Sequence, residues 1–180
     1  QRFEHELHEL VEAVVFSLGQ RLLKSPEMFK ERELGEALWC TAKIERLRNE
    51  QDWVSIVAGA TCDRLDEAPQ KFDGATLATI LESAAKLPLS DVDLLVERVA
   101  TVARRNLVDP PQRFFFDEYA LSTLLWAVAT LHPRDDRLAS AAASATATRL
   151  ADASQRFSEH ALSNIIWSAA KLELAGGDLV

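Results

Sequence analysis

The fold is decided by the stretch FSEHALSNIIWSAAKL at residues 157–172, because three earlier stretches repeat its pattern. They are FKERELGEALWCTAKI at 29–44, FDGATLATILESAAKL at 72–87 and FDEYALSTLLWAVATL at 116–131. Counted from each Phe, a Leu stands at position 5, a Leu or Ile at position 9 and an Ala at position 13 in every copy. Position 10 is Trp39, Trp126 or Trp167, and Glu82 in the second copy. Such self-similarity at a regular spacing indicates a repeat protein.

The apolar spacing predicts that each of these stretches is a helix. Positions 5, 8, 9, 12 and 13 fall on one face when residues are placed at 100° intervals. We therefore expect four signature helices, called A helices here, at 30–44, 73–87, 117–131 and 158–173. The same three-four spacing of apolar residues predicts a second set. These B helices are expected at 5–24, 52–66, about 91–107 and 135–152.

A second series of residues gives the length of the repeat. A Leu stands seven residues before a hinge Phe in every copy, at spacings of 43, 42 and 43 residues: Leu22, Leu65, Leu107 and Leu150. In the third copy the Leu spacing of the B helix places the hinge Phe at Phe114, whereas the A-helix pattern is counted from Phe116. We therefore expect a two-residue insertion in that hinge. A hairpin of one A and one B helix cannot bury its apolar face alone, so neighbouring hairpins stack. The predicted fold is all-α: residues 1–180 form a single α-solenoid segment of stacked two-helix repeats.

The composition is that of an ordered protein with an acidic surface. Hydrophobic residues make up 48% of the chain, charged residues 27%, and the formal net charge is -8. This charge argues against attraction of the whole surface to nucleic acid or anionic lipid, but it allows a local basic stripe. No apolar run approaches the ~20 residues of a membrane span. The chain begins with Gln rather than Met, and we expect it to be a fragment of a longer array.

The sequence carries no recognisable catalytic motif. It has no phosphate-binding Gly-rich loop, no HExxH, no GxSxG and no Cys/His cluster at zinc spacing. Carboxylates are numerous, but they are spread over loops and solvated faces. We therefore predict no enzyme activity, no metal site and no cofactor. Cys40 and Cys62 are interpreted as reduced thiols in core or half-buried positions.

A polar line runs along the A helices at positions 3, 7, 10 and 14, opposite the apolar face. Short polar side chains at position 7 would suit the reading of a linear polymer at one residue per repeat, or they simply face solvent. Lys at position 14 would meet phosphates, or it complements the helix C-terminus. Trp at position 10 offers a stacking surface worth about 1–3 kcal/mol per base, or it packs between repeats. The candidate residues are Glu36, Thr79, Thr123 and Asn164, then Lys43, Lys86 and Lys171, then Trp39, Trp126 and Trp167.

The segments LGEALWCTAKI, LATILESAAKL, LSTLLWAVATL and LSNIIWSAAKL resemble the octotricopeptide repeat family and the related helical arrays found upstream of RAP domains. The pattern is approximately L-x-N-x-[LI]-W-[AS]-x-A-K-L, and residues 162–172 match it best. The resemblance implies an α-solenoid that binds organellar RNA and acts in the processing, stability or translation of chloroplast or mitochondrial transcripts. The polar readers would then be Glu36, Thr79, Thr123 and Asn164. This chain differs in its longer repeats, its one copy without Trp and its acidic charge, and it shows no RAP domain.

Two functions follow from these observations. If the chain is an RNA-binding module, we expect a positive groove along the A helices and single-stranded organellar RNA as the partner. If the chain is a protein scaffold, we expect an uncharged or acidic groove. Its partners would then be subunits of a large organellar complex such as a ribosome, photosystem or respiratory assembly. The acidic net charge favours the scaffold, and the resemblance favours RNA binding. We prefer the RNA-binding function. Localisation to a chloroplast or mitochondrion is implied by the resemblance alone.

Overall fold

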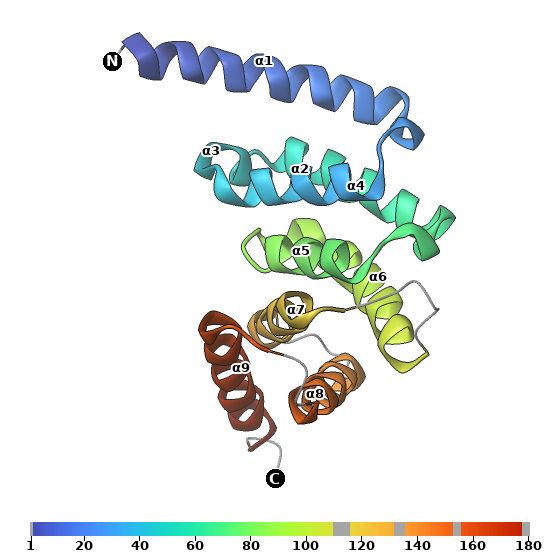
Figure 1. Cartoon of the computed structure of the whole chain (residues 1–180). Coiled ribbons are helices and arrows are strands. Elements are labelled where there is room, and N and C mark those ends of the chain that lie inside the picture. Colours follow the sequence, from blue (N-terminus) through green and yellow to red (C-terminus); the bar gives the residue numbers. More distant parts are fainter. Residues whose placement is uncertain (1, 110–115, 132–135, 153–155, 178–180) are drawn as a thin grey trace.

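The computed structural model describes residues 2–109, 116–131, 136–152 and 156–177 (Figure 1), and over these ranges the regular structure is entirely helical. Two 3-10 turns, η1 (Pro26–Met28) and η2 (Pro69–Lys71), lie in the first two hinges. The α-helices are α1 (Arg2–Lys24), α2 (Glu31–Lys43), α3 (Glu45–Arg48), α4 (Gln51–Glu67), α5 (Gly74–Ala84), α6 (Leu89–Val108), α7 (Glu118–Leu131), α8 (Asp136–Ala151) and α9 (Glu159–Gly177). The prediction of an all-α chain is confirmed.

The predicted A helices correspond to α2, α5, α7 and α9, and the predicted B helices to α1, α4, α6 and α8. The bounds agree within four residues, but two local features differ from the prediction. The charged segment 45–51, between the helices predicted at 30–44 and 52–66, begins with α3, which buries Leu47. Helix α5 ends at Ala84 because the backbone N–H groups of Lys86 and Leu87 bond three residues back, in a tighter turn before Pro88. The insertion expected in the third hinge falls on residues 110–115, outside the described ranges.

Each A helix after the first begins with the same cap, at the residue that follows the hinge Phe. Asp73 Oδ1 accepts the Thr76 N–H at 2.7 Å, and Asp117 Oδ1 accepts the Ala120 N–H at 2.8 Å. Ser158 Oγ takes the same role in α9. In α2 the residue is Lys30, which has no acceptor in its side chain. There the Glu33 carboxylate accepts the Lys30 N–H instead, at 2.8 Å.

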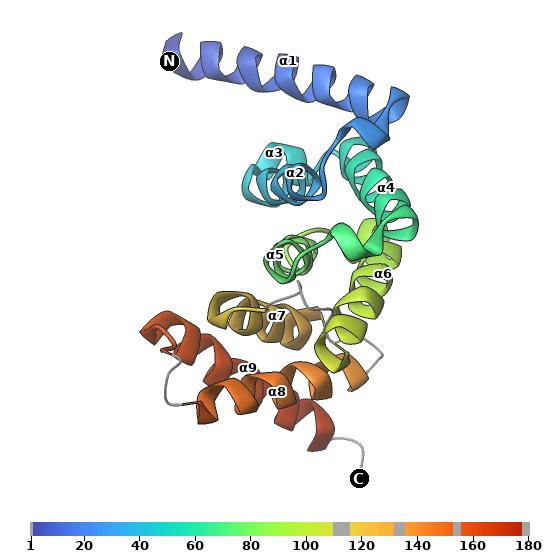
Figure 2. The ribbon, with the colours of Figure 1, turned by 45° about the vertical axis from the view of Figure 1, so that its right-hand side comes forward.

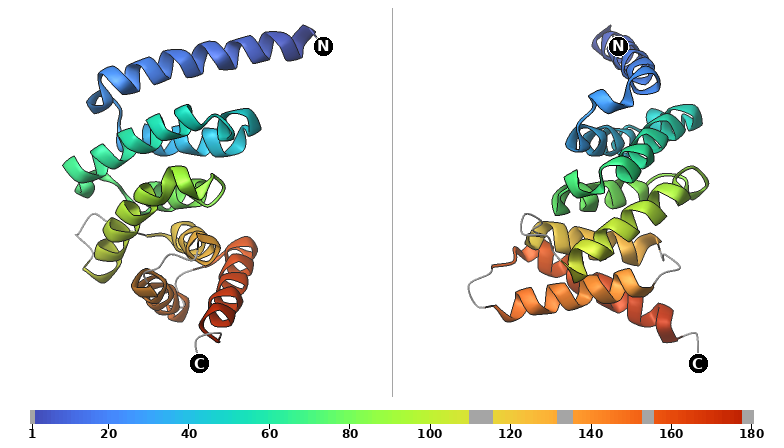
Figure 3. Two further views of the ribbon diagram at one scale, coloured as in Figure 1. Left: turned by 180° about the vertical axis from the view of Figure 1, so that it is seen from behind. Right: turned by 90° about the vertical axis from the view of Figure 1, so that its right-hand side faces the viewer.

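The helices form two layers (Figures 1 and 2). In the first layer α2 packs on α5, α5 on α7 and α7 on α9, and in the second α1 packs on α4, α4 on α6 and α6 on α8. The layers are joined by α2 with α4, α5 with α6 and α7 with α8. The views of Figure 3 show the succession from α1 at one end of the molecule to α9 at the other. Every A helix except α9 therefore has a B helix beside it that follows it in the sequence.

Each inner A helix has three buried sides. Positions 5, 9 and 12 face the B helix, as shown by Thr41 at position 12, whose Oγ1 accepts a hydrogen bond from Trp53 Nε1 at 2.8 Å. Position 6 faces the next A helix: a Cβ added to Gly35 would lie 3.2 Å from Thr76 Cγ2. Positions 4 and 11 face the preceding A helix. They are buried in α5, α7 and α9 but exposed in α2, which no described A helix precedes.

The predicted apolar face is buried or half-buried in α2, α5 and α7, as expected. In α9 most of it is exposed. Leu162 and Ile166, at positions 5 and 9, are 38% and 70% exposed, and Ala169 and Ala170 are also open. The reason is that α9 packs on α7, while no described B helix follows it. Helix α9 thus has the same apolar pattern as the other A helices, but no described B helix covers it.

Candidate nucleic-acid interface

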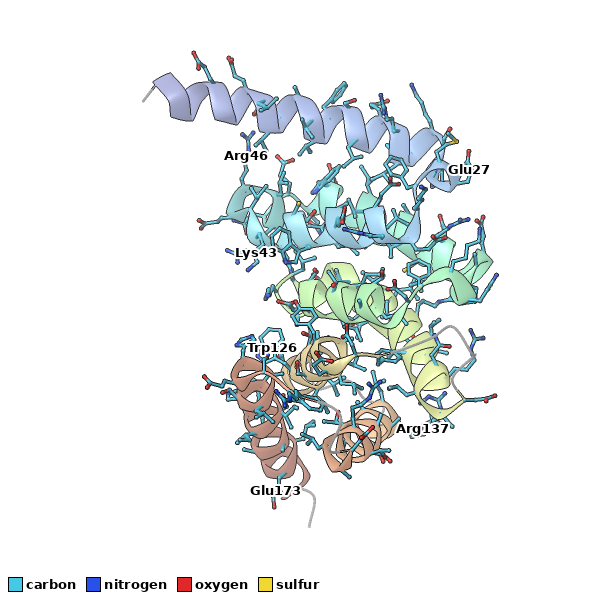
Figure 4. The ribbon with its side chains drawn as sticks, in the orientation of Figure 1. Glu27, Lys43, Arg46, Trp126, Arg137 and Glu173 are labelled. Atoms are coloured by element: carbon cyan, nitrogen blue, oxygen red, sulfur yellow. The ribbon has the colours of Figure 1, made fainter. Side chains whose placement is uncertain are left out.

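The fourth side of the A helices, at positions 3, 7, 10 and 14, forms the outer surface of their layer. Figure 4 shows Lys43 and Trp126 on the same side of the molecule, away from Glu27 and Arg137. Because successive A helices pack beside one another, this side of α2, α5, α7 and α9 faces the same way. The sequence-predicted residues therefore share one face of the protein.

Each of the three candidate lysines lies over a tryptophan ring. Lys43 Nζ is 5.5 Å from the centroid of Trp39, one turn earlier in α2, and Lys171 Nζ is 4.9 Å from that of Trp167 in α9. In the copy that has Glu82 in place of Trp, Lys86 reaches the next helix and lies 5.3 Å from the ring of Trp126. These separations fall within the range of cation–π attraction. The Lys and Trp columns are thus one structural unit.

The three tryptophans at position 10 are each partly exposed and partly packed. Trp39 is 43% exposed and Trp167 is 44% exposed. Trp126 is half-buried and stacks on Trp167, with ring centroids 6.3 Å apart and planes inclined by 28°. Packing between repeats therefore holds for the Trp126–Trp167 pair, across α7 and α9. The open parts of Trp39 and Trp167 remain accessible to a ligand.

A shallow hollow lies between α5, α7 and α9 on this face. Its volume is about 170 Å³, and it is lined by Glu82, Tyr119, Thr123, Trp126, His160 and Asn164. The Asn164 amide nitrogen lies 3.4 Å from His160 Nε2. The hollow brings carboxylate, phenol, imidazole, amide and hydroxyl groups beside an aromatic ring. Such a set could hydrogen-bond the edge of a planar polar group that rests on the ring.

The four position-7 residues differ in their surroundings. Glu36 is exposed, and its Oε1 accepts a hydrogen bond from Arg32 Nε at 2.8 Å. Thr79 and Asn164 are half-buried, whereas Thr123 is buried in the wall of the hollow. The structure therefore brings only Thr123 and Asn164 together, and it leaves Glu36 in a separate ion pair on α2.

Three lining residues were not among the predicted contacts: Glu82, Tyr119 and His160. They occupy positions 10 and 3, on the same line of the helical wheel as the predicted ones. The helical wheel places these residues on the predicted face. Only the packing of α7 between α5 and α9 shows that residues from three copies meet there. Glu82 also pairs with Lys86 one turn later in α5, so this carboxylate and this ammonium group partly neutralise each other.

The cysteines lie outside this face. Cys62 is buried in α4, and burial raises the pKa of its thiol to about 11, against the lowering effect of nearby Arg98. Cys40 is exposed, contrary to the expectation of a core or half-buried thiol. The reason is that it stands at position 11 of α2, on the side that meets a preceding A helix in the other copies.

In residues 2–109, 116–131, 136–152 and 156–177, no group of three His, Cys, Asp or Glu side chains is placed to share a metal ion. Across the same ranges, no helix has the length and apolarity needed to cross a bilayer. No family model, no curated protein and no solved structure matches the chain.

Proposed function

We propose that the chain is a segment of an α-solenoid with a period of about 43 residues, and that its A helices bind single-stranded RNA. The solenoid is supported by the two layers, in which each helix packs on its equivalent in the next copy. It is also supported by the recurrence of caps and buried positions at the same places in successive copies. The chloroplast or mitochondrial role, in transcript processing, stability or translation, rests on the resemblance at residues 162–172.

The observation that carries RNA binding is the row of Lys–Trp pairs along the A layer. Proteins that bind single-stranded nucleic acid combine aromatic surfaces, on which bases stack, with cations that follow the phosphates. Here the two groups are held within cation–π distance of each other on one face, so a stacked base would have an ammonium group nearby. The pairs are Lys43 with Trp39, Lys86 with Trp126 and Lys171 with Trp167.

The net charge of -8 lowers the affinity expected for RNA. The Lys–Trp pairs can still attract a phosphate that binds beside them. At physiological ionic strength, charges more than about 8 Å apart in solvent are largely screened. The groups beside a bound phosphate therefore matter more than the total. Carboxylates on the same face, Glu36 and Glu82, are each paired with a cation, Arg32 and Lys86.

The test is the salt dependence of binding to a fluorescent single-stranded RNA pool of random sequence, measured by anisotropy. Replacing Lys43, Lys86 and Lys171 together by Ala removes up to three phosphate contacts. For single strands the slope of log K against log salt changes by about 0.7 per contact, so it should become shallower by about 2. Trp39→Ala should weaken binding by about 1–3 kcal/mol through the loss of base stacking.

The matched control replaces Lys24, Lys71 and Arg105 by Ala. These exposed cations lie at the ends of α1 and α6 and in η2, on the B-helix side, and their removal changes the net charge by the same amount. If RNA follows the A layer, the control keeps most of the slope. Equal slopes for the two triple variants would refute RNA binding by the Lys column, and so would an absence of binding at low salt.

A protein scaffold is the second candidate, and the acidic net charge favours it. In that function the same face would hold a subunit of a large organellar complex, with Trp39 and Trp167 as partly exposed anchors. Crosslinking of the complex purified from its source separates the two. RNA crosslinked to the A helices supports the first proposal, and a protein-only footprint on them supports the scaffold and refutes RNA binding.

A further inference from the structure

The second copy is the one that breaks the Trp column, and its Glu82 lines the hollow between α5, α7 and α9. At this position the other copies have Trp39, Trp126 and Trp167, whose indoles can only donate a hydrogen bond. A carboxylate can only accept, so the exchange gives this wall of the hollow two acceptor oxygens. A further A helix beyond α9 would meet α9 at position 6, as α5 meets α2 at Gly35, and would leave the hollow open.

The hollow also contains a polar group that the protein itself leaves without a partner. Thr123 is only 5% exposed, and within the described ranges its hydroxyl forms no hydrogen bond. Thr41, another buried Thr of the A helices, donates to the carbonyl of Ala37 four residues earlier. A buried hydroxyl without a partner costs free energy, which a ligand that bonds to it would recover. The volume of about 170 Å³ is several times the ~30 Å³ that a water molecule occupies in the liquid, so the hollow has room for the edge of a base.

An acceptor and a cation stand together at the edge of the hollow. Glu82 forms an ion pair with Lys86, one turn later in α5, and Lys86 Nζ lies 5.3 Å from the ring of Trp126, which also lines the hollow. The Glu82 side chain is 19% exposed. An ionised carboxylate has about four lone-pair sites, so Glu82 can accept further N–H groups while Lys86 holds it. The edge of a ligand that enters here therefore meets acceptors and a donor side by side.

We propose that this hollow selects guanine in the bound strand, an inference that rests on the proposed binding of single-stranded RNA. Guanine is the base whose Watson–Crick edge carries two adjacent donors, N1–H and N2–H, and they match the two oxygens of Glu82 as a guanidinium fork matches a carboxylate. The neighbouring O6 accepts, and the Lys86 ammonium and the Thr123 hydroxyl are the donors beside it. In adenine, cytosine and uracil the single N–H group on this edge lies next to a lone pair, which the second carboxylate oxygen repels.

The first test measures the affinity of the whole chain for four oligouridines that differ only in one central base, G, A, C or U, by fluorescence anisotropy. A good bidentate contact discriminates against the wrong base by a factor of roughly 5 to 150, so the G oligonucleotide should bind at least about fivefold more tightly than the other three. Glu82→Gln replaces one acceptor oxygen by an amide donor and should bring this ratio close to one. The control is Glu67→Gln, which changes the charge equally at an exposed ion pair with Arg64 in α4, on the B-helix side. It should keep the ratio.

The second test uses free nucleotides and separates this inference from RNA binding. GMP, AMP, CMP and UMP are titrated separately while the indole N–H resonance of Trp126 is followed by NMR, because this ring lines the hollow. GMP should shift the resonance at the lowest concentration, and Glu82→Gln should abolish that preference. If the four oligonucleotides bind equally, RNA binding stands and guanine selection is overturned. If none binds at low salt, RNA binding falls, and the nucleotide titration alone decides: equal effects of the four nucleotides, or a GMP preference that survives Glu82→Gln, would overturn the assignment of this hollow.

Discussion

Position 9 of the A helices offers four equivalent sites for a test of the packing. Leu38, Leu81 and Leu125 are almost completely buried, with 0%, 1% and 4% of the residue exposed, whereas Ile166 is 70% exposed. Replacement by Ala removes a comparable apolar group in each case. The sequence pattern treats the four residues as equal, and the structure does not.

The expected losses in the free energy of unfolding differ several-fold. Truncation of a fully buried Leu costs about 2–5 kcal/mol, through the lost transfer energy and the cavity that remains. Burial of a whole Ile side chain is worth about 1.5–3 kcal/mol, and only about three-tenths of Ile166 is covered, so its truncation should cost less than about 1 kcal/mol. Leu38→Ala, Leu81→Ala and Leu125→Ala should therefore each destabilise the chain more than Ile166→Ala does.

The assay is urea unfolding followed by circular dichroism, at a protein concentration low enough for the chain to be monomeric. Midpoints are compared only among variants with equal m-values. Leu94→Ala, at an exposed site on α6, controls for the effect of the substitution on an exposed helix. If Ile166→Ala cost as much as Leu38→Ala under these conditions, α9 would be covered in the free monomer, and the reasoning about its open side would be refuted.

Four further predictions concern individual contacts and buried groups. Thr41→Val removes the acceptor of the buried Trp53 indole and should cost about 1–3 kcal/mol in urea unfolding, whereas Thr101→Val, at an exposed site in α6, should cost less than about 0.5 kcal/mol. Arg64→Ala leaves the largely buried Glu31 without its 2.9 Å partner and should cost about 1–3 kcal/mol, whereas Arg98→Ala breaks only an exposed pair with Asp66 and should cost less than about 1 kcal/mol. Cys40 should react with a thiol reagent in the folded chain at pH 8 and Cys62 only after unfolding. Because the pKa of Cys62 is raised to about 11 in the folded state, its contribution to stability should be complete below pH 9 and fall as the pH rises toward 11, and Cys62→Ala should remove that part of the decline. Equal reactivity of the two thiols, or equal costs within either matched pair, would contradict the burial described for these residues.

The sequence predicts the helices well because the periodic pattern is read four times. Spacing of apolar residues places every A and B helix within a few residues of its observed bounds. The misses are local. Helix α3 forms in a charged segment because one residue, Leu47, reaches the core, and a single Leu leaves no periodic signal. The early end of α5 depends on the turn before Pro88, which periodicity does not describe.

The candidate site was only partly predictable. The wheel groups positions 3, 7, 10 and 14 on one face, but it treats each helix as isolated. It cannot tell that Lys86 reaches across to Trp126, or that Trp126 stacks on Trp167, because these contacts depend on the distance between neighbouring helices. For the same reason it misplaces Cys40, whose exposure is decided by the absence of a described neighbour rather than by its own position in the pattern.

Gly35 has a mechanical consequence for the whole molecule. It lets α2 approach α5 so closely that even a methyl group at this position would lie 3.2 Å from Thr76 Cγ2. Helices α1 to α4 are joined to the later helices by the packing of α2 on α5 and α4 on α6. A larger side chain at position 35 would push α2 away from α5. A small rotation of α2 at this contact would produce a larger displacement at the far end of α1. Gly35 therefore helps to set the separation of α2 and α5, and with it the distance between Trp39 and the aromatic pair on α7 and α9.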